Sequence, residues 1–341
     1  MPVTKPSEPV THAASTAEPA APSRNSAPRA VDEAAAREGG APSEKPLGFW
    51  PRLSFGVVHA ATAMLLRLVG LRGLYICGRV FGTIEWLINF KRRARFLAAF
   101  ERVIGRHGTV GERLSASREF FCQSRCDKLL YLIFDCLSPE RAVSLATMEN
   151  RELLDAALAG GRGVYVALSH FGPHHVAATF MALMGYKVAG VRDRNEGAMR
   201  RFMQERWDRV HPDLQRMRVI YADTFPREIF RCFKDGYLVG SAMDVSRVRV
   251  AHQKMEEVVI FGEPRAFLSG PLRIALRSKA PIVQGFITPR RDFRYYLEVL
   301  GPLLDPNIEM DEDAAVAQAM RVYAETVERY VRANPALLTR L

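Results

Sequence analysis

One short segment limits the possible folds more than any other feature of the chain. Residues 163–175 read Gly-Val-Tyr-Val-Ala-Leu-Ser-His-Phe-Gly-Pro-His-His, an apolar run of strand character that breaks at His170 and Gly172. A pattern compatible with a helix follows over residues 176–184. A strand that turns directly into a helix is typical of α/β proteins. The segment therefore places His170 at the end of a buried strand, a suitable position for a base.

The alternation of strands and helices continues toward the C-terminal part of the chain. Residues 94–160 are expected to be helical and to lead into the sheet. We expect strands at 164–168, 187–192, 218–221, 237–243, 257–261, 281–286 and 295–299, and helices at 176–184, 197–210, 226–234, 271–278 and 313–333. This order predicts an α/β fold, a mostly parallel mixed sheet flanked by helices, with antiparallel strands at its edges.

The first 47 residues differ in composition from the rest of the 341-residue chain. They are dominated by Ala, Pro, Ser and Glu and contain no aromatic residue, so they cannot bury enough surface to offset the entropy of ordering. We expect residues 1–47 to form a disordered tail, which lacks the apolar core of a signal peptide. Residues 48–93 are then an N-terminal helical region, and residues 94–341 the α/β domain.

The positive charge belongs to the part that follows the tail. The chain carries +11 in total, and the five basic and six acidic residues of the tail leave +12 on the remainder. A basic surface suits an anionic partner such as phospholipid headgroups or an acidic carrier protein. We expect no nucleic-acid partner, because the chain contains no recognisable nucleic-acid-binding motif.

The helical region at 48–93 has the composition of a segment that lies in a membrane interface. Its first apolar stretch runs about 14 residues from Leu53, short of the roughly 20 that a bilayer span requires. Its second stretch leads into a basic cluster at residues 91–95. Trp50 and Trp86 beside such a cluster are typical of interfacial helices. A transmembrane anchor and an ordinary pair of core helices with a solvated basic end are the alternatives.

The cysteines are scattered among apolar residues: Cys77, Cys122, Cys126, Cys136 and Cys232. An odd number of such residues indicates buried thiols in a reducing compartment. Cys122 and Cys126 have helical spacing, but no second pair of ligands follows at the distance typical of a zinc site. We therefore expect neither a metal nor another cofactor.

The strand that ends at His170 resembles the signature of a known family. Residues 161–172, Gly-Arg-Gly-Val-Tyr-Val-Ala-Leu-Ser-His-Phe-Gly, are similar to that of the bacterial lipid A biosynthesis acyltransferases, the lauroyl and myristoyl transferases. Further blocks resemble the family in the same order: Val191-Arg192, residues 236–240 followed by Asp244, and residues 261–283, which include Ser269-Gly-Pro and Arg273. The similarity extends from about residue 53 to residue 335, and four ordered blocks are more specific than the first alone.

The resemblance implies an O-acyltransferase at the cytoplasmic face of the inner membrane, peripheral or shallowly anchored. It implies transfer of a fatty acyl chain from an acyl thioester, on acyl carrier protein or coenzyme A, to a hydroxyl of a lipid or glycolipid acceptor. His170 is the expected base, since a neutral imidazole can take the hydroxyl proton near pH 7. Arg192 or backbone amides around Gly172 are expected to stabilise the negative charge that develops on the thioester oxygen.

One departure from the family pattern concerns the partner of this base. The family has an acidic residue five positions after the histidine, whereas this chain has His175. A carboxylate there would hold the tautomer of the base and balance the imidazolium of the transition state. A neutral His175 can accept a hydrogen bond from His170 but supplies no negative charge. We therefore expect an atypical catalytic pair, with Asp193 or Asp244 as candidates for the missing carboxylate.

The candidates for substrate binding are Gly172, Arg192, Asp244, Ser269 and Arg273. Ser269-Gly-Pro is typical of a helix start, and an exposed helix N-terminus can also hold a phosphate.

Two alternatives to an active enzyme stay open. A family member can retain the fold yet be catalytically weak or inactive, and act as a lipid-binding or partner protein. Metal binding by His170, His174 and His175 is the other alternative, although Gly172 and Pro173 interrupt the helix that such spacing requires.

Overall fold

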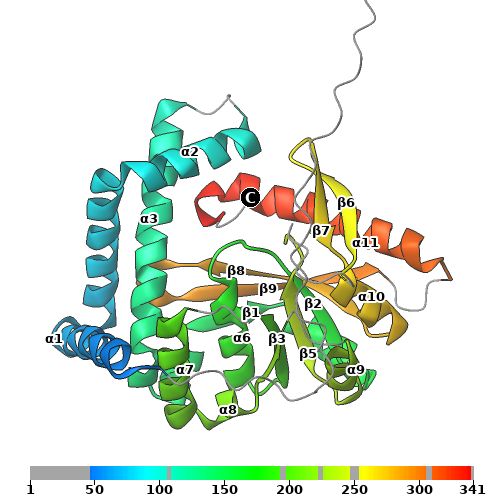
Figure 1. The fold of residues 1–341 in the computed structure, drawn as a ribbon, viewed down its shortest axis with the longest axis horizontal. Helices are drawn as coiled ribbons and strands as arrows, with labels where there is room; N and C mark the ends of the chain where they lie inside the picture. Colours follow the sequence, from blue (N-terminus) through cyan, green and yellow to red (C-terminus); the bar gives the residue numbers. More distant parts are fainter. Residues whose placement is uncertain are drawn as a thin grey trace, which may run out of the picture. The chain divides into compact units, whose positions relative to one another are not determined.

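A seven-stranded sheet lies at the centre of the fold (Figure 1). The computed structural model describes residues 47–105, 109–192, 197–221, 226–245, 253–304 and 309–338. The strand order is β1-β9-β8-β2-β5-β3-β4. The strands are β1 (Ala146–Glu149), β2 (Val164–Leu168), β3 (Val188–Arg192), β4 (Arg218–Tyr221), β5 (Leu238–Ala242), β8 (Ile282–Pro289) and β9 (Tyr295–Leu304).

Five neighbouring strands of this sheet run in one direction. β8, β2, β5, β3 and β4 are parallel, whereas β9 is antiparallel to β8 and pairs in parallel with β1 at the edge. The predicted α/β fold with a mostly parallel mixed sheet is confirmed. β1 was not expected, because residues 94–160 were predicted to be helical throughout.

Helices cover both faces of the sheet because the strands are apolar on both sides. On one face Leu154 of α5 (Arg151–Ala159) packs with Val164 and Leu238, and α6 (His174–Leu183) lies on the same face. Tyr165 and Ala167 of β2 point the other way. They pack in the core shared with α9 (Arg227–Lys234), α10 (Gly270–Arg277) and α11 (Glu312–Ala333).

A separate hairpin packs against α11. It consists of β6 (Met255–Ile260) and β7 (Glu263–Leu268), which pair in antiparallel register. The strand expected at 257–261 is therefore present but lies outside the central sheet. Its partner β7 was not predicted.

The N-terminal region forms three long helices. They are α1 (Phe49–Ile88), α2 (Phe90–Ile104) and α3 (Val110–Ile133), and α1 lies along α3 (Figure 1). The two apolar stretches expected before residue 93 are one helix, interrupted only at Gly70, whose φ of 67° and ψ of 179° are not helical. The expected boundary at residue 93 lies inside α2.

Much of the apolar surface of α1 is exposed. Phe49 and Trp50 are 71% and 75% exposed. The other large apolar side chains exposed along this helix are Leu53, Val57, Val58, Met64, Leu68, Val69, Ile76, Val80, Phe81, Ile84, Leu87 and Ile88. Among the described residues α1 alone is long and apolar enough to cross a membrane, by length and composition. The apolar stretch of about 14 residues from Leu53 is therefore part of a longer helix of 40 residues.

The cysteines only partly follow the expectation of buried thiols. Cys122, Cys126 and Cys232 are buried, and Cys77 is half-buried. Cys136 is exposed, in the 3₁₀ turn η1 (Phe134–Cys136) that follows α3.

Candidate active site

His170 and Asp244 come together through the register of two neighbouring strands. Strands β2 and β5 are parallel, and Leu168 at the end of β2 pairs with Ala242 at the end of β5. His170 and Asp244 each follow two residues later. The two side chains therefore leave the same edge of the sheet at the same level, where α/β proteins place ligands.

The carboxylate of Asp244 bonds His170 at two points. Nδ1 of the imidazole lies 2.7 Å from Oδ1, and the backbone N–H of His170 donates to Oδ2, also over 2.7 Å. Both side chains are largely buried, with 14% and 9% of their surfaces exposed. When Nδ1 donates to the carboxylate, the neutral ring carries its basic lone pair on Nε2. Of the two candidate carboxylates, Asp244 lies beside His170, and Asp193 lies outside the described residues.

Gly172 makes the turn that follows His170. Its φ is 59°, and a Cβ atom there would lie 2.6 Å from the carbonyl oxygen of Ile287, so a larger residue does not fit. Its backbone N–H donates to the carbonyl oxygen of Leu337 over 2.6 Å, and Phe171 forms a β-bridge with Leu338. The amide of Gly172 was one of the donors expected to face the thioester oxygen. It is instead bonded to the C-terminal segment.

His174 and His175 begin α6 next to this turn. The His174 ring packs edge-on against His170, with 5.0 Å between ring centroids. Burial, with a smaller effect from His170, lowers the pKa of His174 to about 4, so this ring is neutral near pH 7. The His175 ring lies 5.8 Å from that of His174 and 6.0 Å from that of Tyr131. The acidic partner seen at Nδ1 of His170 thus comes from β5 and not from α6.

A cavity of about 880 Å³ opens beside His170. It lies between the sheet and α3, α5 and α6. Val166 and Leu168 are the half-buried residues of β2, and both face this space. Apolar side chains supply much of its lining: Leu154, Val166, Leu168, Met181, Leu238, Val283, Phe286, Leu297 and Val299. The volume lies within the range typical of small-molecule sites.

The lining of this cavity also includes charged groups, several of them on helices. The cations are Arg92 of α2, Lys128 of α3 and Arg200 of α7 (Ala198–Val210). Asp127 of α3 also lines the cavity and accepts a hydrogen bond from the Tyr295 hydroxyl over 3.1 Å. Burial raises the pKa of Asp127 to about 7. Glu298 lines the cavity as well, and Arg92 is ion-paired with Glu85 over 2.8 Å. A cavity with an apolar floor and charged groups of both signs fits an amphiphilic ligand.

The remaining predicted site residues are divided between the cavity and other places. His170, Gly172 and His175 line it, whereas Asp244 is not a lining residue and contacts His170 instead. Arg192 ends β3, and its side chain lies outside the described part of the chain.

Ser269 and Arg273 are not among the residues that line the cavity. Ser269 is the N-cap of α10, and its hydroxyl donates to the carbonyl oxygen of Lys254 over 3.2 Å. Arg273 forms ion pairs with carboxylates of β6 and α11: Glu256, Glu312 and Asp313. These contacts tie both residues to neighbouring segments of the fold, and their role in substrate binding stays a prediction.

Helix α3 contributes lining residues that the sequence did not single out. Asp127 lies beside Lys128 among the apolar residues of α3, within the stretch 94–160 that was expected to be helical. A carboxylate on an apolar helix face is a signal that could have identified it.

The model of the family described as bacterial lipid A biosynthesis acyltransferase matches residues 51–339. None of the curated proteins matches the chain significantly. The match covers most of the chain, as did the resemblance of its four blocks. The protein therefore belongs to the bacterial lipid A biosynthesis acyltransferase family.

Proposed function

We propose that the protein is a membrane-associated O-acyltransferase that uses His170 as general base and Asp244 as its carboxylate partner. The acyl donor is a thioester of acyl carrier protein or coenzyme A, and the acceptor is a hydroxyl of a lipid or glycolipid. The observation that supports this proposal most strongly is the His170–Asp244 hydrogen bond beside a largely apolar cavity.

In the proposed reaction Nε2 of His170 takes the proton of the acceptor hydroxyl as the oxygen attacks the thioester carbon. The carbon–sulfur bond then breaks, an ester forms, and the proton passes from the imidazolium to the departing thiolate. Asp244 keeps Nδ1 protonated and offsets the positive charge of the imidazolium. It acts through His170 and is therefore a positioning residue. Arg192 is the proposed donor to the oxyanion, since the Gly172 amide is bonded to Leu337.

The apolar cavity is the proposed site of the acyl chain. Its lining begins at His170 and reaches Leu238, which pairs with Val164 six residues before the histidine. At about 3.3 Å per residue, this corresponds to a depth of about 20 Å along the strand. A slot of that depth with an apolar floor suits a fatty acyl chain whose thioester lies beside the base.

The exposed face of α1 is the proposed membrane contact, and the chain then lies at the cytoplasmic face of the inner membrane. The basic residue Lys128 lines the cavity and can attract an anionic donor or headgroup. We propose that His175 lines the cavity next to the substrate, because the acidic role that its position has in the family can be carried by Asp244.

Acyl transfer by the purified protein tests this function. The assay offers fatty acyl thioesters of carrier protein and of coenzyme A, with lipid extracts as acceptors, and identifies products by mass spectrometry. Activity that His170→Ala abolishes is the expected result. Absence of transfer by the wild type, together with tight binding of fatty acyl probes, would support the alternative of an inactive lipid-binding member of the family.

A further inference from the structure

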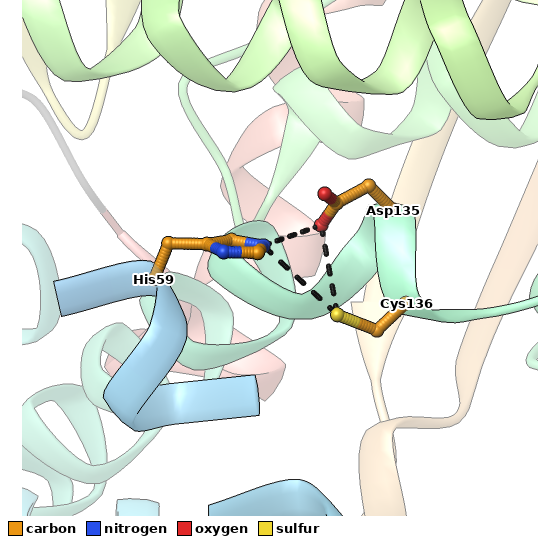
Figure 2. Close-up of side chains that lie close together, drawn as sticks. All are labelled: His59, Asp135 and Cys136. Carbon is orange, nitrogen blue, oxygen red and sulfur yellow. Dashed lines mark hydrogen bonds and ion pairs between the residues drawn. The ribbon is translucent and has the colours of Figure 1, made fainter. Parts of the chain in front are cut away.

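A second group of polar side chains converges where α1 meets the end of α3. His59 of α1 points toward Asp135 and Cys136 of η1 (Figure 2). Nε2 of His59 lies 2.9 Å from Oδ1 of Asp135 and 3.9 Å from Sγ of Cys136, and the sulfur lies 3.8 Å from Oδ1. None of these residues lines the cavity beside His170. Their donors are one nitrogen, one oxygen and one sulfur.

We propose that His59, Asp135 and Cys136 form a zinc site with an open fourth position. Typical Zn–N, Zn–O and Zn–S bond lengths place ligands of a tetrahedral ion about 3.3 Å apart for nitrogen and oxygen, and about 3.6 Å apart when one is sulfur. The observed separations of 2.9, 3.8 and 3.9 Å lie within about half an ångström of these values. Small side-chain rotations are therefore sufficient for the three atoms to hold one ion.

The charges in this group also suit a divalent cation. A neutral imidazole, a carboxylate and a thiolate together carry two negative charges, which balance Zn²⁺. Arg206 donates from Nε to Oδ2 of Asp135 over 2.7 Å, so it occupies the oxygen that the ion does not need. Such an outer partner orients a ligating carboxylate. The mixed nitrogen, oxygen and sulfur donors favour zinc over calcium or magnesium, which prefer oxygen.

The site is partly buried and still reachable. The side chains of His59 and Asp135 are only 9% and 3% exposed, whereas Cys136 is exposed. An ion can therefore enter from the side of the thiol. Zinc binding forms the Zn–S bond as the Cys136 thiol loses its proton to solvent.

A metal at this position would connect two parts of the protein with different tasks. His59 belongs to the half of α1 that precedes Gly70, and Asp135 and Cys136 lie in the turn η1 that follows α3, a helix that lines the cavity. The bound ion would add a cross-link between the exposed apolar helix and the α/β domain. The protein would then hold α1 against the domain more firmly in the metal-bound form.

Metal titration of the full chain tests the site independently of acyl transfer. Chelator-treated wild type in reducing buffer should bind one equivalent of Zn²⁺, release protons, and melt at a higher temperature. Co²⁺ should give a thiolate-to-cobalt charge-transfer band in the near ultraviolet. Cys136→Ser should remove this band and weaken Zn²⁺ binding about 100-fold, and Arg206→Ala should weaken it by about 10-fold to 100-fold.

Cys77→Ser is the matched control, because Cys77 is a half-buried thiol of α1 outside the group. It should leave both the band and the affinity unchanged. The proposal is overturned if the wild type binds no Zn²⁺ above the level of Cys136→Ser, or if Co²⁺ shows no band that depends on Cys136. The His59–Asp135 contact would then be an ordinary buried ion pair. Circular dichroism of each variant without metal shows whether it folds.

Discussion

The His170 imidazole and the Asp244 carboxylate lie 2.7 Å apart because two parallel strands of matched register end at the same level. The carboxylate uses its second oxygen to bind the backbone N–H of His170. One side chain therefore fixes both the ring and the backbone that carries it. In the proposed reaction Asp244, which follows β5, takes the role expected of an acidic residue in the first turn of α6.

Asp244→Asn should lower kcat/KM for acyl transfer on the order of 10²-fold to 10⁴-fold, as losing such a carboxylate does elsewhere. The amide oxygen would accept from the backbone N–H of His170, which leaves the NH₂ group facing Nδ1. Nδ1 must then accept, and the ring proton moves to Nε2, where it blocks the base. Steady-state kinetics with a carrier-protein thioester measure the effect, and an unchanged melting temperature excludes unfolding.

His175→Ala is the companion of this experiment. If Asp244 is the functional acid, the loss of the His175 imidazole should cost less than about 10-fold, because general-base catalysis of about 10²-fold to 10⁴-fold rests on His170. A loss from His175→Ala equal to that from Asp244→Asn would contradict the assignment. The double variant with Asp244→Asn and His175→Glu extends this test. If adding His175→Glu restores the activity that Asp244→Asn removes, the two positions are interchangeable.

Gly285→Val should shift the preferred acyl chain to a shorter length. Gly285 lines the cavity, and a Cβ atom there would lie 3.1 Å from Cγ1 of Val166 and 3.4 Å from Cδ2 of Leu168. The added side chain therefore occupies the proposed acyl slot. Competition between thioesters of different lengths, read by mass spectrometry, measures the shift. Gly301→Val in β9 is the control, because a Cβ atom there meets nothing within 4 Å. If both variants transfer the same distribution of acyl-chain lengths, the cavity is not the acyl-binding site.

The contribution of Asp127 to the free energy of unfolding should fall as the pH rises from about 4 to about 7, against the opposite contribution of His174, whose pKa burial lowers to about 4. Burial raises the pKa of this carboxyl to about 7 in the folded protein. In that window the unfolded chain ionises while the folded chain keeps its proton, so folding becomes less favourable as pH rises and the loss levels off above pH 7. The contribution is at most on the order of 4 kcal/mol.

Asp127→Asn isolates this contribution. The amide oxygen can still accept the Tyr295 hydrogen bond, and nothing at the position titrates. The variant should be more stable than the wild type at pH 8 and equal to it near pH 4, as measured by denaturant unfolding. Parallel pH profiles for the two proteins would show that Asp127 ionises normally.

Replacing Phe49 and Trp50 with serine should weaken membrane binding by at least about 10-fold, since each buried aromatic side chain contributes roughly 1.5–3 kcal/mol. Both side chains are exposed at the start of α1. Co-sedimentation with anionic vesicles measures the change. Val219→Ser, on an exposed apolar residue of β4, is the control. If high salt abolishes membrane binding and the substitutions of Phe49 and Trp50 leave it unchanged, the protein is attached through basic residues instead.

The alternation of strands and helices was enough to predict the sheet, because buried parallel strands are apolar runs bounded by turns. It could not predict which strands pair. That Asp244, two residues after β5, lies beside His170 depends on the pairing of β2 with β5, two segments far apart in the chain, which local pattern does not encode. β1 was missed because Ala146–Glu149 is a short edge strand inside a largely helical stretch.

The site could be predicted only in part for a related reason. His170 and Gly172 stand out locally, since a strand ends there and the turn needs a positive φ. Ser269 and Arg273 were singled out from a motif, yet their hydrogen bonds and ion pairs connect α10 with its neighbours. Helix α3 also contributes residues that line the cavity. Its sequence pattern indicates only that one face is buried in the core, and the tertiary packing shows that part of this face borders the cavity.

The hydrogen bond from Gly172 to Leu337 has a consequence for the order of events during biosynthesis. If α1 is the membrane contact, as we propose, a nascent chain presents this helix to the bilayer soon after it leaves the ribosome. The loop that carries the base, however, gains its closing contact only after residues 335–338 have been translated. Membrane attachment should therefore precede acyl-transfer activity. An mRNA truncated before the codons for residues 335–338 would yield a protein that binds the membrane but lacks the contact with Gly172.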